Sequence, residues 1–371
     1  MSQDIIRNIH FKKNSHYMEI FILFDHLGET IRGVEPKEKF IVQEHLLKLV
    51  DTLWHSFEQD YAHLALVSDV LFGNDTDSFG EQVTNIFLQW EKEGTSLVAL
   101  IAHAIEHFGL DVDKPCVKSA FMAAILAEYP NDLKYHGNGH YRKVLFHAIR
   151  LITTHNRIYK DTNRIINNDQ IAELLAAACI HDLGHEGGDN LRDGVYTPGK
   201  MEQYALDIAR PYFQALDLPE DQLGDIETIV FCTDITFFAG DNSPCIRMKK
   251  IYKHFFWDDD REDVGMMMVG KLRRYEDNPR LVLMAMILHE ADIATSAGLS
   301  YDQTVTETIN IMEERGVTTA GPKTVLAFLR EQLGETMFTE AGKQLYGRVM
   351  ADVIKQAEQD VARGRDTFYE E

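Results

Sequence analysis

Apolar side chains recur at every third or fourth position through most of the 371-residue chain, and this spacing constrains the fold more than any other feature. The segments 40–57 and 144–158 show it most clearly. Side chains three and four residues apart share one face of an α-helix, whereas a half-buried strand needs alternation at every second position, which is almost absent here. Turn-forming residues separate the periodic segments, for example at 72–78 and 315–322. The sequence therefore predicts an all-α fold built of many helices.

The amount of apolar material bears on the domain organisation. Hydrophobic residues make up 45% of the chain, which is enough for one large helical core or two smaller ones. Residues 1–125 carry no clustered metal-ligand side chains, so we interpret them as a helical scaffold or accessory region. Residues 126–371 contain such clusters and are expected to form the catalytic domain. No Pro-rich linker marks a boundary between the two regions.

Charge and hydropathy exclude several classes of function. The formal net charge of −22 argues against nucleic-acid binding, because the phosphate backbone is itself anionic. The longest apolar runs, 174–180 and 281–288, are shorter than a bilayer-spanning helix, and segment 1–14 lacks the apolar centre of a signal peptide. The four cysteines are far apart, which fits a reducing compartment. We expect a cytoplasmic protein that binds a small molecule rather than a nucleic acid or a membrane; an oligomer is compatible with this pattern.

The strongest local motif is a His-Asp pair at the end of an apolar helical segment. His181 and Asp182 offer an imidazole and a carboxylate, the ligand types that borderline divalent metals accept. His185 follows four residues after His181, so a helical backbone places both imidazoles on one face. A His-Asp dipeptide alone is common, but one that ends a buried helix and precedes Gly-Gly-Asp-Asn indicates a metal site.

A second motif consists of two histidines four residues apart. Of His136 and His140, one can ligate a metal while the other faces the substrate. The stripe continues through His147 and His155, but His147 lies about 10 Å beyond His140 along a helix axis and cannot share an ion with it. We interpret His147 and His155 as ordinary helix-face residues, and the same interpretation stays open for His136.

The third motif is an acid within a long apolar helix. Asp292 follows the apolar run 281–288 and lies beside His289 and Glu290. A buried carboxylate is costly unless it is paired or coordinates a metal. The alternative is that Asp292 caps or breaks the helix before the small-residue stretch 294–298. Taken with the other two motifs, Asp292 is more readily explained as a metal ligand.

These motifs, in this order, resemble those of the HD superfamily of metal-dependent phosphohydrolases, and more narrowly the catalytic domain of class I cyclic-nucleotide phosphodiesterases. Tyr135-His136 followed by His140 is similar to the family's Tyr-His-Asn-x-x-His. The segment 181–190 is similar to His-Asp-x-x-His-Pro-Gly-x-x-Asn. The segment 233–235, Thr-Asp-Ile, resembles Thr-Asp-Met, and 289–293 resembles a segment that ends in Ala-Asp-Leu or Ala-Asp-Ile. The four pieces occur in family order within residues 135–300.

The resemblance implies a centre of two divalent metal ions in an all-helical fold. It assigns the first ion to four side chains: His140, His181, Asp182 and Asp292. Asp182 would bridge to a second ion held mainly through water, with further partners in His185, Glu202, Asn190 and Thr233. The family's usual metals are zinc at the first position and magnesium or manganese at the second; iron is a further possibility.

The resemblance also implies a reaction, the hydrolysis of a 3′,5′-cyclic nucleotide (cAMP, cGMP or both) to the 5′-monophosphate. His136 would be the general acid that protonates the leaving 3′ oxygen, a role worth about 10²–10⁴-fold in rate. Tyr135, Gln332 and Phe338 are the candidates for contacts with the nucleotide.

The chain departs from the family pattern at several positions. Gly137 and Glu186 stand where the family has Asn and Pro, and the family's Glu-Asn-His-His is reduced to Glu-Gln-Tyr at 202–204. Glu335 occupies the position of the Phe that grips the base. Two alternatives therefore stay open: a generic HD phosphohydrolase that acts on nucleoside monophosphates, cyclic dinucleotides or another phosphoester, and a non-catalytic HD-fold sensor or scaffold.

Overall fold

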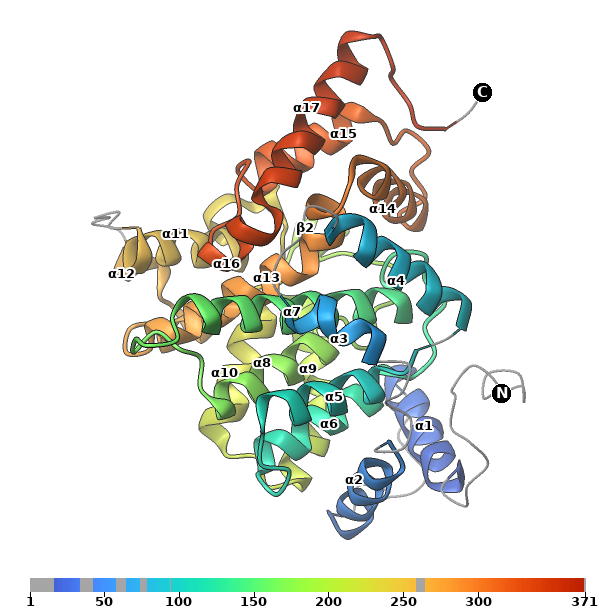
Figure 1. The fold of residues 1–371 in the computed structure, drawn as a ribbon, viewed down its shortest axis with the longest axis vertical. Helices are drawn as coiled ribbons and strands as arrows, with labels where there is room; N and C mark the ends of the chain where they lie inside the picture. The colour runs from blue at the N-terminus through green and yellow to red at the C-terminus, as the bar shows by residue number, and fades with distance from the viewer. Residues whose placement is uncertain are drawn as a thin grey trace.

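The computed structural model describes residues 17–33, 43–57, 65–73, 79–93, 95–257 and 264–369. Within these ranges the chain consists of helices joined by short connections, with a single two-stranded ribbon (Figure 1). The predicted all-α fold is confirmed. Segment 1–14 and the turn residues 74–78 lie outside the described residues.

The helices and strands follow one another along three parts of the chain. The N-terminal part contains α1 (Tyr17–Ile31), α2 (Gln43–Phe57), α3 (Ala65–Phe72), α4 (Phe79–Glu93), α5 (Leu97–Phe108) and α6 (Pro115–Ala127). The middle part contains α7 (Asn138–Ile158), α8 (Asn168–Ile180), β1 (Leu191–Arg192), β2 (Val195–Tyr196), α9 (Lys200–Ala215), α10 (Glu220–Phe231), η1 (Phe237–Asn242) and α11 (Pro244–Phe256). The C-terminal part contains α12 (Val264–Met267), η2 (Gly270–Tyr275), α13 (Pro279–Gly298), α14 (Tyr301–Glu314), α15 (Pro322–Ala327), η3 (Phe328–Gln332), α16 (Glu340–Gly342), η4 (Lys343–Gly347) and α17 (Arg348–Ala362).

Helices α7, α8 and α13 form the centre of the molecule (Figure 1). Asn167 and Gln170 start α8 with reciprocal side-chain to backbone hydrogen bonds, a capping box, and residues 171–180 are all buried. Pro279 and the Asn278 side chain start α13 in a comparable way. A helix that is apolar on all sides must be surrounded by other helices. The sequence of α8 and α13 therefore places both helices in the core.

Helix α13 is the one described helix that is long and apolar enough to cross a membrane by length and composition alone. It runs for 20 residues and so extends well beyond the apolar run 281–288 seen in the sequence. Within its most apolar window, 94% of the residues are buried inside the molecule. Its apolar character is thus explained by the neighbouring helices of this chain.

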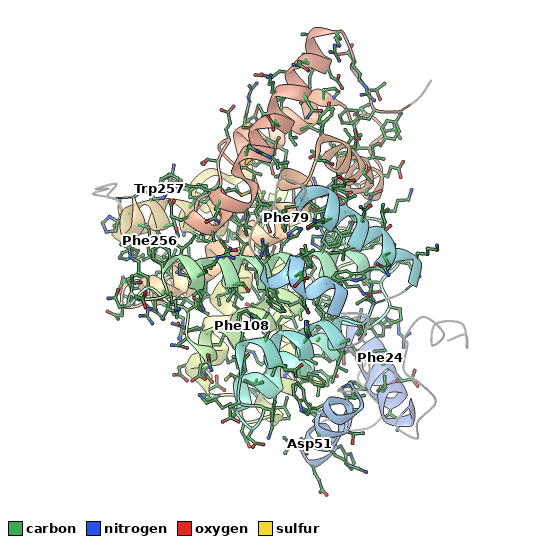
Figure 2. All side chains as sticks on the ribbon, viewed as in Figure 1. Phe24, Asp51, Phe79, Phe108, Phe256 and Trp257 are labelled. Atoms are coloured by element: carbon green, nitrogen blue, oxygen red, sulfur yellow. The ribbon has the colours of Figure 1, made fainter. Side chains whose placement is uncertain are left out.

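Buried side chains from α1 to α17 belong to one continuous hydrophobic core. Figure 2 marks two of its N-terminal members, Phe24 on α1 and Phe79 on α4. Helix α6 crosses the division expected at residue 125 and packs along α8. The N-terminal helices thus share their core with the helices that carry the metal-ligand motifs.

The C-terminal helices form one end of the molecule, where α14, α15 and α17 pack together (Figure 1). Directly after α15, the backbone forms a single π-helical turn, η3. Such turns are frequent at functional sites because they redirect side chains without ending the helix. Both α14 and η3 contribute side chains to a cavity that Asp182 and Asp292 also line.

Candidate metal centre

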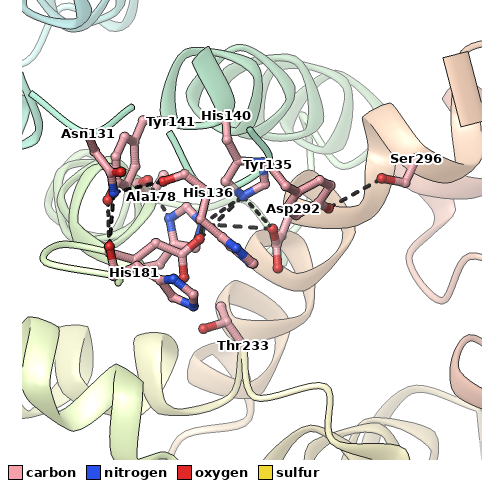
Figure 3. Close-up of polar contacts among 12 residues, drawn as sticks. Asn131, Tyr135, His136, His140, Tyr141, Ala178, His181, Thr233, Asp292 and Ser296 are labelled. Atoms are coloured by element: carbon pink, nitrogen blue, oxygen red, sulfur yellow. Dashed lines mark hydrogen bonds and ion pairs between the residues drawn. The ribbon is translucent and has the colours of Figure 1, made fainter. Parts of the chain in front are cut away.

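Three helices bring the four predicted metal ligands to one point. His140 lies in the first turn of α7, His181 and Asp182 directly follow α8, and Asp292 lies within α13. The His140 Nε2 atom is 3.0 Å from Asp292 Oδ1 and 3.4 Å from Asp182 Oδ2. His181 Nε2 is 3.2 Å from Asp182 Oδ2 and 3.3 Å from His140 Nε2 (Figure 3). His140, His181 and Asp292 each offer a ligand atom, all within 4.8 Å of one another, so these three side chains could hold one ion, and Asp182 lies next to the two histidines.

Neighbouring groups fix the orientation of these ligands. The Nδ1 atom of His181 lies 3.0 Å from the carbonyl oxygen of Ala178, which leaves Nε2 directed toward the centre (Figure 3). The Tyr141 hydroxyl donates to the main-chain carbonyl of Asp182 at 2.5 Å. Hydrogen bonds of this kind hold metal-binding side chains in place before an ion arrives.

The electrostatics of the four groups favour a bound cation. Burial opposes the charged forms, but hydrogen bonds to Asp182 and Asp292 raise the pKa of His140 to about 10. The pKa of His181 is also raised, since Asp182 and Asp292 outweigh its burial. His181 and His140 in turn hold the pKa of Asp182 well below its usual range despite its burial. Two imidazoles facing two carboxylates bind either protons or a metal ion, and nitrogen and oxygen donors at this spacing fit zinc or a similar divalent ion.

A second cluster of two histidines and an acid lies beside the first. The Nδ1 atom of His136 is 2.5 Å from Glu314 Oε1, and the rings of His136 and His185 stack with centroids 3.9 Å apart. Glu314 Oε2 also accepts the backbone N–H groups of Tyr135 and His136, at 3.0 and 3.1 Å. Burial opposes ionisation of Glu314, but these hydrogen bonds lower its pKa to about 2. Glu314 is therefore a fixed anion that orients His136.

Sequence reasoning did not identify Glu314. It lies at the end of α14, 178 residues after His136, and its surroundings in the sequence read as an ordinary helix end. No local spacing connects it with the histidines. Only the packing of α14 against the segment before α7 brings the two groups together.

Asn131 ties the two histidine segments to each other. Its side-chain amide donates to the main-chain carbonyls of both His136 and His185, at 3.0 and 3.1 Å. The His185 Nδ1 atom accepts the backbone N–H of Gly187 at 3.0 Å. Burial lowers the pKa of His185 to about 4, so its imidazole is neutral near pH 7.

The departure from the family pattern at residue 137 has a steric cause. The carbonyl oxygens of Leu133 and Asn131 lie so close to Gly137 that a Cβ atom there would collide with both. The amide expected at this position is supplied by the next residue, Asn138. Its side chain accepts the N–H of Asn131 at 2.8 Å and donates to the carbonyls of two earlier residues, Ala127 and Tyr129. Asn138 therefore closes the loop that presents His136.

The remaining polar candidates surround the centre. The Asn190 side chain donates to Glu202 Oε2 at 3.0 Å and accepts the N–H of Met201 at 2.8 Å. Burial, reinforced by the nearby charge of Asp234, raises the pKa of Glu202 well above its usual value. Asp234 Oδ2 in turn accepts the hydroxyl of Tyr196 at 2.6 Å and the N–H of Gly199 at 2.9 Å. Asn190, Glu202, Thr233 and Asp234 all line the same cavity as Asp182 and Asp292.

That cavity has a volume of about 330 Å³. Asp182, Asp292 and His136 line one part of it, and Phe328 and Gln332 line another. Tyr135 also lines it, with its hydroxyl 3.3 Å from Ser296 Oγ (Figure 3). A space of this size suits a small molecule of the dimensions of a nucleotide.

The structure places one predicted substrate contact elsewhere. Phe338 is 5% exposed and stacks on Trp257, with ring centroids 5.1 Å apart, and it is not among the residues that line the cavity. Phe328 occupies the cavity wall instead, four residues before Gln332 in the π-helical turn. The chain reverses through the left-handed residue Glu335 before it reaches Phe338, which turns that ring into the core.

The other histidines and the other acid near these motifs lie outside the cavity. His147 is buried between the hydroxyls of Tyr346 and Thr295, and His155 bonds the carbonyl of Arg164, as expected for helix-face residues. On α13, His289 contacts Cys245, whereas Glu290 accepts backbone N–H groups of residues 338 and 339. Of the three polar residues 289, 290 and 292, only Asp292 therefore faces the centre.

Comparison with known proteins gives no matching family model and no matching curated sequence. Among solved structures, the phosphodiesterase domain of the RhoPDE fusion protein from the choanoflagellate Salpingoeca rosetta is similar. It is 13% identical, with a TM-score of 0.48, over 83% of this chain and 99% of that one. LmjPDEB1 in complex with IBMX is 14% identical, with a TM-score of 0.47, over 98% of this chain and 99% of that one.

Proposed function

We propose that this chain is a metal-dependent phosphodiesterase that hydrolyses a 3′,5′-cyclic nucleotide to the 5′-monophosphate. The observation that carries the proposal is the convergence of His140, His181, Asp182 and Asp292 beside one cavity, which Asp182 and Asp292 line. His136, which is hydrogen-bonded to Glu314, lines the same cavity. A metal site and a proton donor are two functions that together catalyse cleavage of a phosphodiester.

The four converging side chains would hold the first ion, for which zinc fits the mixed nitrogen and oxygen donors. Asp182 would also be a ligand of a second, harder ion such as magnesium or manganese, whose other ligands would be mostly water. When bound, a pair of divalent ions lowers the pKa of a water molecule and stabilises negative charge on phosphoryl oxygens. Such ions would also attract an anionic substrate to a protein whose net charge is −22.

His136 would protonate the leaving 3′ oxygen. Its Nδ1 atom is engaged by Glu314, so Nε2 is the nitrogen from which a proton can pass to the substrate. The two backbone hydrogen bonds that Glu314 accepts keep its carboxylate in place, so that it orients the His136 ring. When His136 gives up its proton, the 3′ oxygen leaves as an alcohol rather than as a poor alkoxide leaving group.

The other part of the cavity would hold the nucleoside. Phe328 offers an aromatic face, Gln332 an amide, and Tyr135 a ring next to the metal ligands. These groups suit a purine or pyrimidine ring, which has apolar faces and a polar edge.

All four cysteines are free and buried, in keeping with a protein of the reducing cytoplasm.

The test is a substrate panel with the purified full-length chain. It comprises cAMP, cGMP, cyclic dinucleotides and nucleoside 5′-monophosphates, each with magnesium, manganese or zinc, together with metal analysis of the protein. We expect conversion of a 3′,5′-cyclic mononucleotide to its 5′-monophosphate and loss of that activity with a chelator. Cleavage confined to the other substrates would replace the proposal with a generic phosphohydrolase, and metal binding without any turnover would indicate a sensor.

A further inference from the structure

A second carboxylate on α14, that of Glu307, lines the same cavity. The residue is 4% exposed, and its Oε1 atom accepts hydrogen bonds from Lys143 Nζ at 2.8 Å and Gln303 Nε2 at 2.7 Å. The other oxygen, Oε2, has no hydrogen-bond or ion-pair partner among the residues that the structure describes. The proposed hydrolysis makes no use of this group.

The second oxygen of Glu307 can accept further hydrogen bonds. A carboxylate offers about four acceptor positions, and the two hydrogen bonds described above both go to Oε1. Lys143 on α7 compensates the charge and fixes that oxygen. Because Glu307 lines the cavity, a molecule that occupies this space can donate to Oε2.

The surroundings of Glu307 restrict what this partner can be. Glu307 belongs to neither of the side-chain groups in the described residues that can hold a metal ion. An anionic phosphoryl group would be repelled by the carboxylate. Ile311, Met312 and Phe328 line the same cavity and provide apolar surface for a flat ring. A neutral N–H group on the edge of such a ring fits both the carboxylate and the apolar wall.

We propose that Glu307 determines base specificity by accepting a hydrogen bond from an N–H group of the nucleobase, either an exocyclic amino group or a ring N–H. This inference rests on the proposed cyclic-nucleotide activity and extends it to the base. Lys143 and Gln303 hold the carboxylate in place before the ligand binds, so little ordering is needed on binding. A base with an acceptor at the same position leaves two negative atoms facing each other and is rejected.

The chain contains a matched control for Glu307. Glu91 also pairs with Lys143, at 3.8 Å, but its side chain is 58% exposed and does not line the cavity. Glu91→Gln therefore makes the same chemical change next to the same lysine outside the site. Glu307→Gln leaves the ammonium of Lys143 without its buried partner and can therefore fold poorly. The double variant Lys143→Met/Glu307→Met removes both charges of the pair and serves as the alternative in that case.

The experiment compares cAMP and cGMP with the 3′,5′-cyclic monophosphate of purine riboside, whose base carries no N–H group. Turnover and equilibrium binding are measured for the wild type, Glu91→Gln, Glu307→Gln and the double variant. We expect the wild type to prefer cAMP or cGMP over the purine riboside analogue by about tenfold to hundredfold, mainly through KM and Kd. Glu91→Gln should keep this ratio, whereas Glu307→Gln and the double variant should reduce it to less than about threefold.

The outcomes separate the two proposals. If wild type and Glu307 variants show the same ratio, or the wild type shows no preference, the role assigned to Glu307 is refuted while the phosphodiesterase activity stands. If the wild type binds these nucleotides without hydrolysing them, the proposed reaction is refuted, and the ratios of Kd values still decide the role of Glu307. If it neither binds nor hydrolyses any of them, both proposals are refuted.

Discussion

Two clusters of histidines and acids lie side by side on one cavity, and they differ in how their polar atoms are satisfied. In the first, the Nε2 atoms of His140 and His181 are only 3.3 Å apart, and each faces two carboxylates. In the second, the His136 ring bonds Glu314 at 2.5 Å through Nδ1 and stacks on His185. Under the proposed function, the same residue types would serve a shared cation in one place and an oriented proton donor in the other.

The two clusters also differ in the parts of the chain that supply them. The first comes from α7, α13 and the turn directly after α8, with His181 1% and His140 5% exposed. The second comes from the loop before α7, the loop after α8 and the end of α14. Both clusters are therefore held by side-chain and backbone hydrogen bonds, but the second depends on contacts between segments that lie far apart in the sequence. Four substitutions, taken from the largest expected effect to the smallest, test this comparison.

Removal of a ligand from the first cluster should have the largest effect. Asp292→Ala should abolish turnover and reduce bound metal. Substitution of a residue that only bonds a metal ligand typically costs about 10–100-fold in metal affinity or activity, so loss of a ligand itself should cost more than about 100-fold. Metal analysis and steady-state kinetics measure both effects. Asp302→Ala, an exposed acid on α14, is the control and should change neither. Full activity with normal metal content in Asp292→Ala would remove Asp292 from the centre.

Loss of the proton donor should leave the metal in place. His136→Ala should reduce kcat by about 10²–10⁴-fold, as expected for a general acid, with metal content close to that of the wild type. The same two measurements apply. A metal-free His136→Ala protein would mean that the two clusters act as one site, and the distinction between them would be lost.

Loss of the charge that orients His136 should have a smaller effect. Glu314→Gln keeps the shape but replaces the carboxylate that bonds the His136 ring and two backbone N–H groups, and it should cost about tenfold to hundredfold in kcat. Steady-state kinetics together with metal analysis of wild type and variant test this directly. An unchanged kcat would show that Glu314 does not position His136.

A third histidine, on the same helix as His140, sharpens the comparison further. His147 bonds the hydroxyls of Tyr346 and Thr295, and His147→Gln should leave turnover and metal content unchanged. It should lower the free energy of unfolding by about 1–3 kcal/mol, the cost of leaving buried partners unsatisfied, as measured by urea denaturation. Reduced metal content in His147→Gln would show that this region supports the centre.

The pH dependence of stability has a definite sign at His147. Burial, with the charges of Lys143 and His140 adding to it, lowers the pKa of this residue to about 3, against an ordinary value of 6.5. Between these values the unfolded chain binds a proton at this position and the folded protein does not. The contribution of His147 to stability is therefore present above pH 6.5 and is lost as pH falls toward 3. His147→Gln should remove this part of the acid sensitivity.

The sequence by itself determined the helical class and the side chains that meet in the first cluster. Apolar spacing depends only on neighbouring residues, and so do the pair His181-Asp182 and the acid Asp292 within an apolar helix. It also excluded His147 and His155 from the centre, because a helix has a fixed rise per residue.

Only the tertiary structure decided the partners of these groups. Glu314 and Glu307 acquire their roles because α14 packs against α7 and the loop before it, more than 160 residues away in the chain. Phe328, rather than Phe338, lines the cavity because a π-helical turn and a left-handed residue set the direction of the chain between them. Spacing along a helix fixes which side chains share a face, but the contacts between faces depend on how distant segments pack, and no local pattern contains that information.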